Sequence, residues 1–187
     1  MPNQYGLPAF DPTTAVEGDP NSPIWIVALN PKTEEEDHVS GGNNPITWKD
    51  TNPSAPHFMR LQGILGPDWY PKLFQPKGIA HTDIVKCGSP AFTLIEANAV
   101  PVCHEFFLAQ IKKHKPKLLL VLSSYAARII AKDAGLSDDA TEGAWKFGEE
   151  GEFCYVVLSG YSAPQQERYA KLRLKRDFLA AAQHYIR

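Results

Sequence analysis

The residue best placed to do chemistry in this chain is Asn30, which directly follows the apolar run 24–29. That run is short and contains β-branched residues, a pattern typical of a buried strand. Pro31 cannot continue a hydrogen-bonded ladder because it has no N–H group. We therefore expect Asn30 at the carboxyl end of a central strand, where open α/β sheets bind their ligands. Its amide can hold a water or a substrate carbonyl there.

Two further polar sites lie near the ends of predicted strands. Asp83 lies near the end of the apolar segment 79–85, and an ionised carboxylate at such a position only accepts hydrogen bonds. Ser123 and Ser124 follow the run 118–122 and precede a helical pattern. A helix N-terminus can hold an anion, but we favour simple capping by these serines. The histidines His38 and His81 are possible proton donors, although a lone histidine near a strand end is more often structural.

The remaining periodicity predicts the elements that must position these residues. We expect an irregular lead-in over 1–23 and a long polar loop over 30–54. The predicted strands are 24–29, 79–85, 118–122 and 153–158, and the predicted helices are 55–65, 101–115, 125–132 and 165–186. Strands that alternate with helices favour an α/β fold, here a three-layer α/β/α sandwich with a central, mostly parallel four-stranded sheet.

Length and composition narrow the class of protein. The 187 residues indicate a single domain over 1–187, which we expect to be a monomer. A net charge of −2 excludes a globally basic nucleic-acid coat but leaves room for a local basic groove. No apolar run approaches the roughly 20 residues of a membrane span. Three cysteines make no disulfide framework, so we expect a reducing, cytoplasmic setting.

Three blocks of sequence carry a resemblance to a known family. They are 27–32 with the acidic stretch 34–37, then 82–87, then 103–108 with 116–117 and 122–127. In this order and spacing the chain resembles the uracil-DNA glycosylase superfamily, and is closest to its iron–sulfur and mismatch-specific classes. The resemblance implies a uracil-DNA glycosylase-like fold, damaged DNA as the partner, and base excision by hydrolysis of an N-glycosidic bond in DNA repair.

The resemblance also assigns roles to individual residues. It makes Asn30 and Ser162 the catalytic candidates and Asp83 the reader of the base edge. Ile46 aligns with the residue that stacks on the base, and Trp48 lies two positions further on. Ser54 and Ser124 are the candidates for contacts with DNA phosphates, which position a strand without reading it. For Asn30 the alternative is an Asn-Pro turn, and for Trp48 it is packing in the core.

The chain departs from the family pattern at three places. Cys87 and Cys103 match two of the four cluster cysteines of the iron–sulfur class, but no cysteine precedes them, so we predict no cluster and no other cofactor or metal. Gly160-Tyr161-Ser162 stands where the family has His-Pro-Ser. Asp83 replaces the asparagine that reads uracil, so either the target is not plain uracil or Asp83 is protonated. A solvated strand-end carboxylate is the alternative.

Three functions remain open from the sequence. The first is a DNA glycosylase-like hydrolase acting on uracil or a related damaged base. The second is a catalytically impaired module on the same fold that binds nucleic acid or a base. The third is an α/β enzyme with another small substrate, because a fold does not fix chemistry. A basic run supports a solvated helix surface more than a DNA groove; it comprises Arg168, Lys171, Arg173, Lys175 and Arg176.

Overall fold

The computed structural model describes residues 16–29, 56–75, 77–85, 100–147, 152–159 and 167–186. A six-stranded sheet forms the middle layer, in the order β1-β3-β2-β4-β6-β5. Its strands are β1 (Val16–Glu17), β2 (Ile24–Ala28), β3 (Ala80–Asp83), β4 (Leu118–Val121), β5 (Glu142–Lys146) and β6 (Phe153–Leu158). The four inner strands, β3-β2-β4-β6, are parallel, and β1 and β5 pair antiparallel at the two edges.

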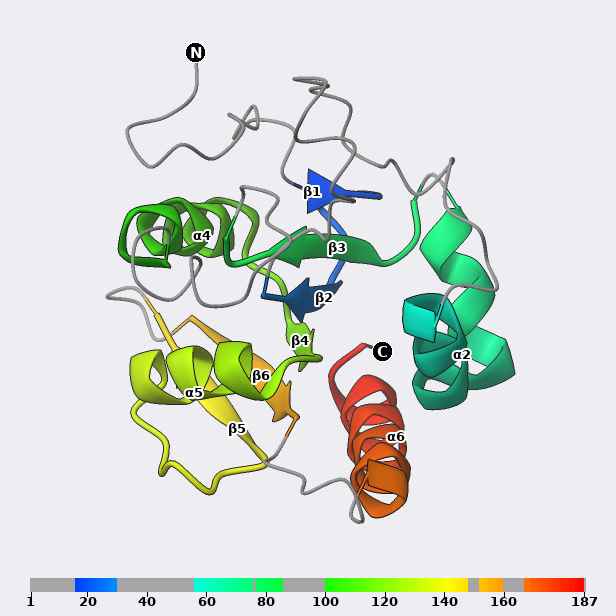
Figure 1. Cartoon of the computed structure of the whole chain (residues 1–187). Coiled ribbons are helices and arrows are strands. Elements are labelled where there is room, and N and C mark those ends of the chain that lie inside the picture. The colour runs from blue at the N-terminus through cyan, green and yellow to red at the C-terminus, as the bar shows by residue number, and fades with distance from the viewer. Residues whose placement is uncertain are drawn as a thin grey trace, which may run out of the picture.

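Helices cover both faces of the sheet, which confirms the three-layer α/β/α prediction (Figure 1). One face carries α4 (Val100–His114) and α5 (Ser124–Asp133). The other carries α2 (Pro56–Trp69) and α6 (Glu167–Tyr185), which lie side by side, and a short 3-10 helix, Tyr70–Phe74, continues from α2.

The sheet side chains divide into two cores by alternation. In β2, Trp25 and Val27 pack in the core beneath α4 and α5, whereas Ile24 and Ile26 pack in the core beneath α2 and α6. All four are buried, as expected for a strand covered on both faces. Full burial of this kind explains why the central strands read as continuous apolar runs in the sequence.

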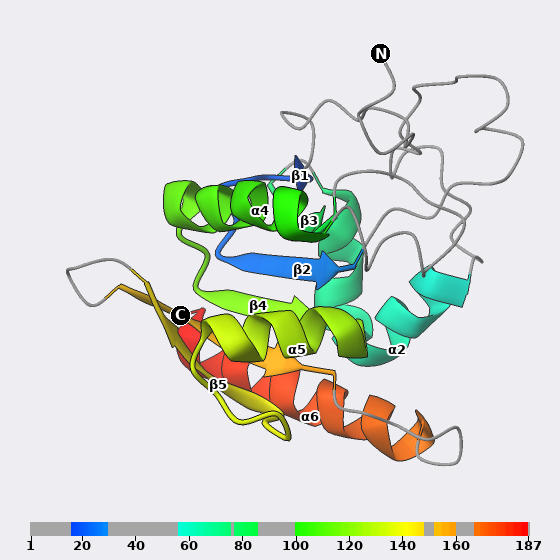
Figure 2. The same ribbon diagram turned by 60° about the vertical axis from the view of Figure 1, so that its left-hand side comes forward.

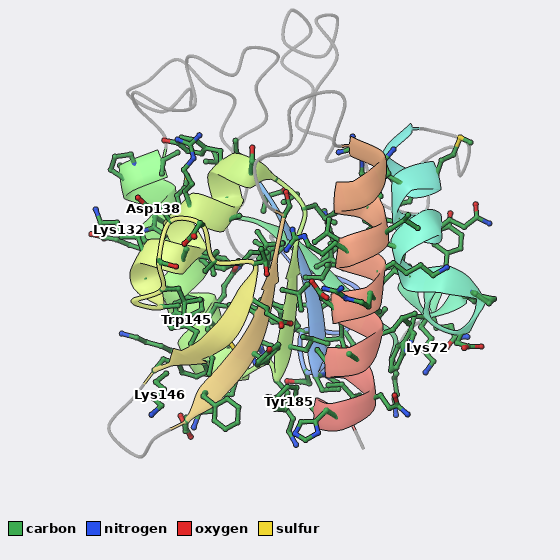
Figure 3. All side chains as sticks on the ribbon, turned by 90° about the horizontal axis from the view of Figure 1, so that it is seen from below. Lys72, Lys132, Asp138, Trp145, Lys146 and Tyr185 are labelled. Carbon is green, nitrogen blue, oxygen red and sulfur yellow. The ribbon has the colours of Figure 1, made fainter. Side chains whose placement is uncertain are left out.

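Two expectations are corrected by the edge strands. The predicted four-stranded sheet is the parallel core of a six-stranded one, and the lead-in 1–23 contains β1. Neither edge strand has a strong sequence signal, because β1 has two residues and β5 is mostly exposed, with Trp145 its one buried side chain. Figure 3 shows Trp145 on the side of β5 that faces α5.

Helix α2 continues past the point where the sequence predicted its end. Gly66 breaks the helical backbone of α2 with a φ of 71°, a value that glycine adopts without strain, but the chain resumes helical turns at Pro67. The predicted helix 55–65 therefore matches only the first part of α2. None of the described helices is long and apolar enough to span a bilayer.

Candidate functional site

The carboxyl ends of the four parallel strands lie at one edge of the sheet (Figure 2). Ala28 of β2 stands opposite Asp83 of β3 in register. Pairing continues one residue past β2, because the Leu29 carbonyl accepts a hydrogen bond from the Val85 N–H at 2.8 Å. The pairing of this segment therefore reaches the carboxyl edge at Leu29.

The strand order creates a topological switch point at this edge. From β2 the chain passes through α2 to β3 on one side, whereas β4 lies on the other side of β2 and is followed by α5. Because α2 and α5 cover opposite faces, the connections diverge between β2 and β4. Ligands of open α/β sheets bind at such points, outside the carboxyl ends of the strands. Leu29 and Leu122 flank this position, and the Leu122 N–H donates a hydrogen bond to the Val27 carbonyl.

Asp83 is the last residue of β3 and lies on the α2 face of the sheet. Its neighbour Thr82 is 1% exposed and donates a hydrogen bond from its hydroxyl to Oε1 of Gln110 in α4, at 3.4 Å. Alternation along the strand therefore turns Asp83 and His81 to the opposite face. Asp83 is half-buried, and its Oδ1 atom is closed off from solvent. The structure thus brings a shielded carboxylate to the carboxyl edge, one strand from the end of β2.

Ser123 and Ser124 flank the other side of the switch point. The Ser123 Oγ accepts a hydrogen bond from the Ala126 N–H at 3.3 Å, and the Ser123 carbonyl accepts from the Ala127 N–H at 2.8 Å. Ser123 is therefore the N-cap of α5, which confirms the capping prediction. Ser124 is the first residue of α5 and is half-buried.

The described cysteines do not fit the iron–sulfur cluster of the related class. Cys103 and Cys154 are both buried in the core beneath α4 and α5. Burial raises the pKa of the Cys154 thiol to about 12, as expected for a cysteine packed among apolar side chains. Four cluster thiolates are the usual requirement, and the chain has three cysteines in all. Within the described ranges, no group of three or more histidine, cysteine or acidic residues is placed to hold a metal ion.

Arg173, which the sequence analysis placed in a basic run on a solvated helix surface, lies at this edge of the sheet. Its Nη2 donates a hydrogen bond to the carbonyl of Leu158, the last residue of β6, at 3.0 Å. Lys171 and Arg176 are exposed instead, so the basic run divides between the helix surface and the sheet edge. The spacing of Arg173 and Asp177, four residues apart on a helix, was the available signal for a paired guanidinium.

Most of the other site candidates lie outside the described residues. These are Asn30, His38, Ile46, Trp48, Ser54, Cys87 and Ser162. Among the residues to which the resemblance assigns a role, the structure describes Asp83 and Ser124, which lie on β3 and α5 at the same edge of the sheet.

An α/β sheet with a ligand-binding switch point and polar strand ends defines a broad class of proteins. Within that class, the family described as the uracil DNA glycosylase superfamily matches residues 15–184. The chain belongs to this superfamily, as the three sequence blocks indicated. No curated protein matches the chain.

Proposed function

We propose that this chain is a DNA glycosylase-like hydrolase that removes a damaged or deaminated base from DNA. The observation that carries the proposal is the register of Asp83 opposite Ala28 at the carboxyl edge, in a member of the uracil-DNA glycosylase superfamily. That register brings the candidate base reader beside the strand whose next residues are Leu29 and Asn30.

The reaction sets four requirements for such a site. The base must leave the stack, its edge must be read, charge on the departing base must be stabilised, and a water must reach the sugar. Asn30 is the proposed group for orienting the water or polarising a base carbonyl, since an amide cannot act as a base. Asn30 directly follows Leu29 in the sequence, which supports its assignment to this edge.

Asp83 is the proposed reader of the base. A carboxylate accepts hydrogen bonds and opposes a keto oxygen, whereas it suits an exocyclic amine. The shielding of Oδ1 from solvent supports this role, because a hydrogen bond to a carboxylate is stronger where bulk water does not compete for it. The proposed target is therefore a base other than plain uracil, or a keto base read by protonated Asp83.

The remaining candidates complete the proposal. Trp48, with Ile46 nearby in sequence, is the proposed stacking platform for the flipped base. Ser162 occupies the place of the missing histidine motif, and we assign it to the reacting region. Ser54 and Ser124 are the proposed phosphate contacts; for Ser124, the position at the first turn of α5 supports an anion contact.

Base release from defined oligonucleotides tests this function. Duplex and single-stranded substrates would carry uracil, hypoxanthine, xanthine or 5-hydroxycytosine, and alkaline cleavage would detect abasic sites. We expect release of at least one base, and a fall of about 100- to 1,000-fold in Asn30→Ala. Asn21→Ala, an exposed asparagine before β2 at the opposite edge, is the matched control and should retain activity. Activity that survives Asn30→Ala unchanged would remove Asn30 from the mechanism.

A non-catalytic binding module is the second candidate function. It is favoured by Gly160-Tyr161-Ser162 at the place of the family's His-Pro-Ser motif. It predicts saturable binding of damaged oligonucleotides, measured by fluorescence anisotropy, without release of any base over long incubation.

A further inference from the structure

The guanidinium of Arg173 is held at the carboxyl edge of β6 by two contacts. Its Nη2 bonds the Leu158 carbonyl, and its Nη1 lies 3.7 Å from Oδ2 of Asp177, one turn further along α6. Asp177 is 5% exposed, so it is a fixed and largely buried anchor. Arg173 itself keeps 22% of its side chain exposed. It is therefore held in place by the protein without being sealed inside it.

The charges in this cluster do not cancel. Oδ1 of Asp177 is taken by Arg176, whose Nη2 lies at 2.7 Å and whose Nε donates at 2.8 Å. Two guanidinium groups thus share one carboxylate, which leaves a net charge of about +1, because arginine stays protonated. The Nη1 atom of Arg173 is buried, and nothing in the described part of the chain hydrogen-bonds it. It faces Oδ2 of Asp177, which is buried as well, and the 3.7 Å between the two atoms is longer than a hydrogen bond. The guanidinium has five N–H donors, so donors other than Nη1 and the one bonded to Leu158 remain for an acceptor from outside.

The cluster of Arg173, Arg176 and Asp177 lies across the sheet edge from Asp83. Both lie at the carboxyl edge and on the α2–α6 face of the sheet, with β2 and β4 between β3 and β6. Three strand spacings separate the ends of β3 and β6 by roughly 14 Å. The carboxylate of Asp83 thus lies on one side of the switch point, and the guanidinium of Arg173 lies on the other.

We propose that Arg173, positioned by Asp177, binds an anionic oxygen group of the nucleic acid at this edge. The inference rests on the proposed function for its ligand. The anion has two possible sources, a phosphate of the bound strand or the departing base, and both present oxygen acceptors that suit a guanidinium. If the anion is the phosphate, the base lies toward Asp83 and the phosphate toward β6, so the charges also set the direction of the nucleotide across the sheet.

Salt-dependent binding of an uncleavable oligonucleotide tests the phosphate source. Single-stranded DNA carrying a tetrahydrofuran abasic analogue would be titrated by fluorescence anisotropy at several salt concentrations. Arg173→Gln should weaken binding about 5- to 30-fold and reduce the slope of log K against log salt by about 0.7. Lys113→Gln, on α4 at the opposite edge of the sheet, is the matched control and should change neither quantity.

Single-turnover base release tests the departing base. If the anion bound by Arg173 is the departing base, Arg173→Gln lowers the rate of base release at saturating enzyme, while Kd and the salt slope stay unchanged. A purely structural role for Arg173 would lower the melting temperature but leave Kd, slope and rate at the values of Lys113→Gln, and that result would overturn the proposal. If Arg173→Gln reduces the salt slope but the wild type releases no base, Arg173 is still an anion site and the proposed glycosylase function is wrong.

A conservative variant keeps the test valid if Arg173→Gln does not fold. Arg173→Lys retains the charge but loses the planar fork, so it should retain most of the salt slope while binding or release weakens by about 3-fold or more. Values equal to those of the wild type in both assays would contradict an anion contact through the guanidinium.

Discussion

Replacing Asp83 with asparagine should change which base the chain accepts. The bases 5-hydroxycytosine and 5-hydroxyuracil form a matched pair, because they differ at the exocyclic amine or keto group and at the ring N–H beside it. The wild-type carboxylate accepts from the amine of the first and opposes the keto oxygen of the second. In Asp83→Asn the amide can donate to that keto oxygen, so the preference should move toward 5-hydroxyuracil.

The size of the change follows from the burial of the carboxylate. Asp83 is half-buried and its Oδ1 is closed to solvent, so water cannot compensate fully for a mismatched contact. A hydrogen bond to a charged group at such a site contributes about 1.5–3 kcal/mol. The ratio of the two release rates should therefore shift by about 10- to 100-fold.

Competition between the two substrates in one reaction measures this ratio directly. Asp68→Asn, an exposed aspartate on α2, is the matched control and should leave the ratio unchanged. A ratio in Asp83→Asn equal to that of the wild type, in a protein with an unchanged melting temperature, would refute the role of Asp83 as base reader.

Three further predictions concern the scaffold that positions the site. Ser123→Ala removes the N-cap of α5 and should lower the free energy of unfolding by about 1 kcal/mol, measured by urea denaturation. Gly78→Ala places a Cβ against the Lys72 carbonyl oxygen and should cost about 1–3 kcal/mol or more, whereas Gly63→Ala, whose Cβ meets open space on α2, should stabilise the chain by about 0.5–1 kcal/mol. The buried Cys154 thiol has its pKa raised from 9.0 to about 12, so the unfolded chain ionises first and the free energy of unfolding should fall between pH 9 and 12. Cys154→Ala should flatten that fall, and equal pH slopes for the two proteins would contradict the assignment.

The central strands could be predicted from sequence because burial on both faces leaves a plain signal. Runs such as Leu118–Val121 are apolar at every position, and Pro116 marks where the preceding helix must stop. The strand β5 gave no such signal, since it contains Gly143 and exposes a charged residue at each end. Its identity as a strand comes from antiparallel pairing with β6, which is a contact distant in sequence.

The candidate site also contains one feature that the sequence could predict and one that it could not. The place of Asp83 at a strand end follows from local pattern, and the structure confirms that place without testing its role. The contact between Arg173 and the Leu158 carbonyl depends on how α6 packs across β6, and no local pattern specifies it. In Figure 3, α6 runs beside the sheet from its first turn to Tyr185 at the opposite end, so only its early turns reach the carboxyl edge.

A crystal structure with a trapped substrate tests the central claim most directly. The oligonucleotide would carry the preferred base on a 2′-fluoro sugar, which resists hydrolysis. We predict a flipped base beside the end of β2, with the side chains of Asn30 and Asp83 both within about 3.2 Å of its polar atoms or of one bridging water. A base bound elsewhere, or these two side chains directed to different edges of the sheet, would contradict the account.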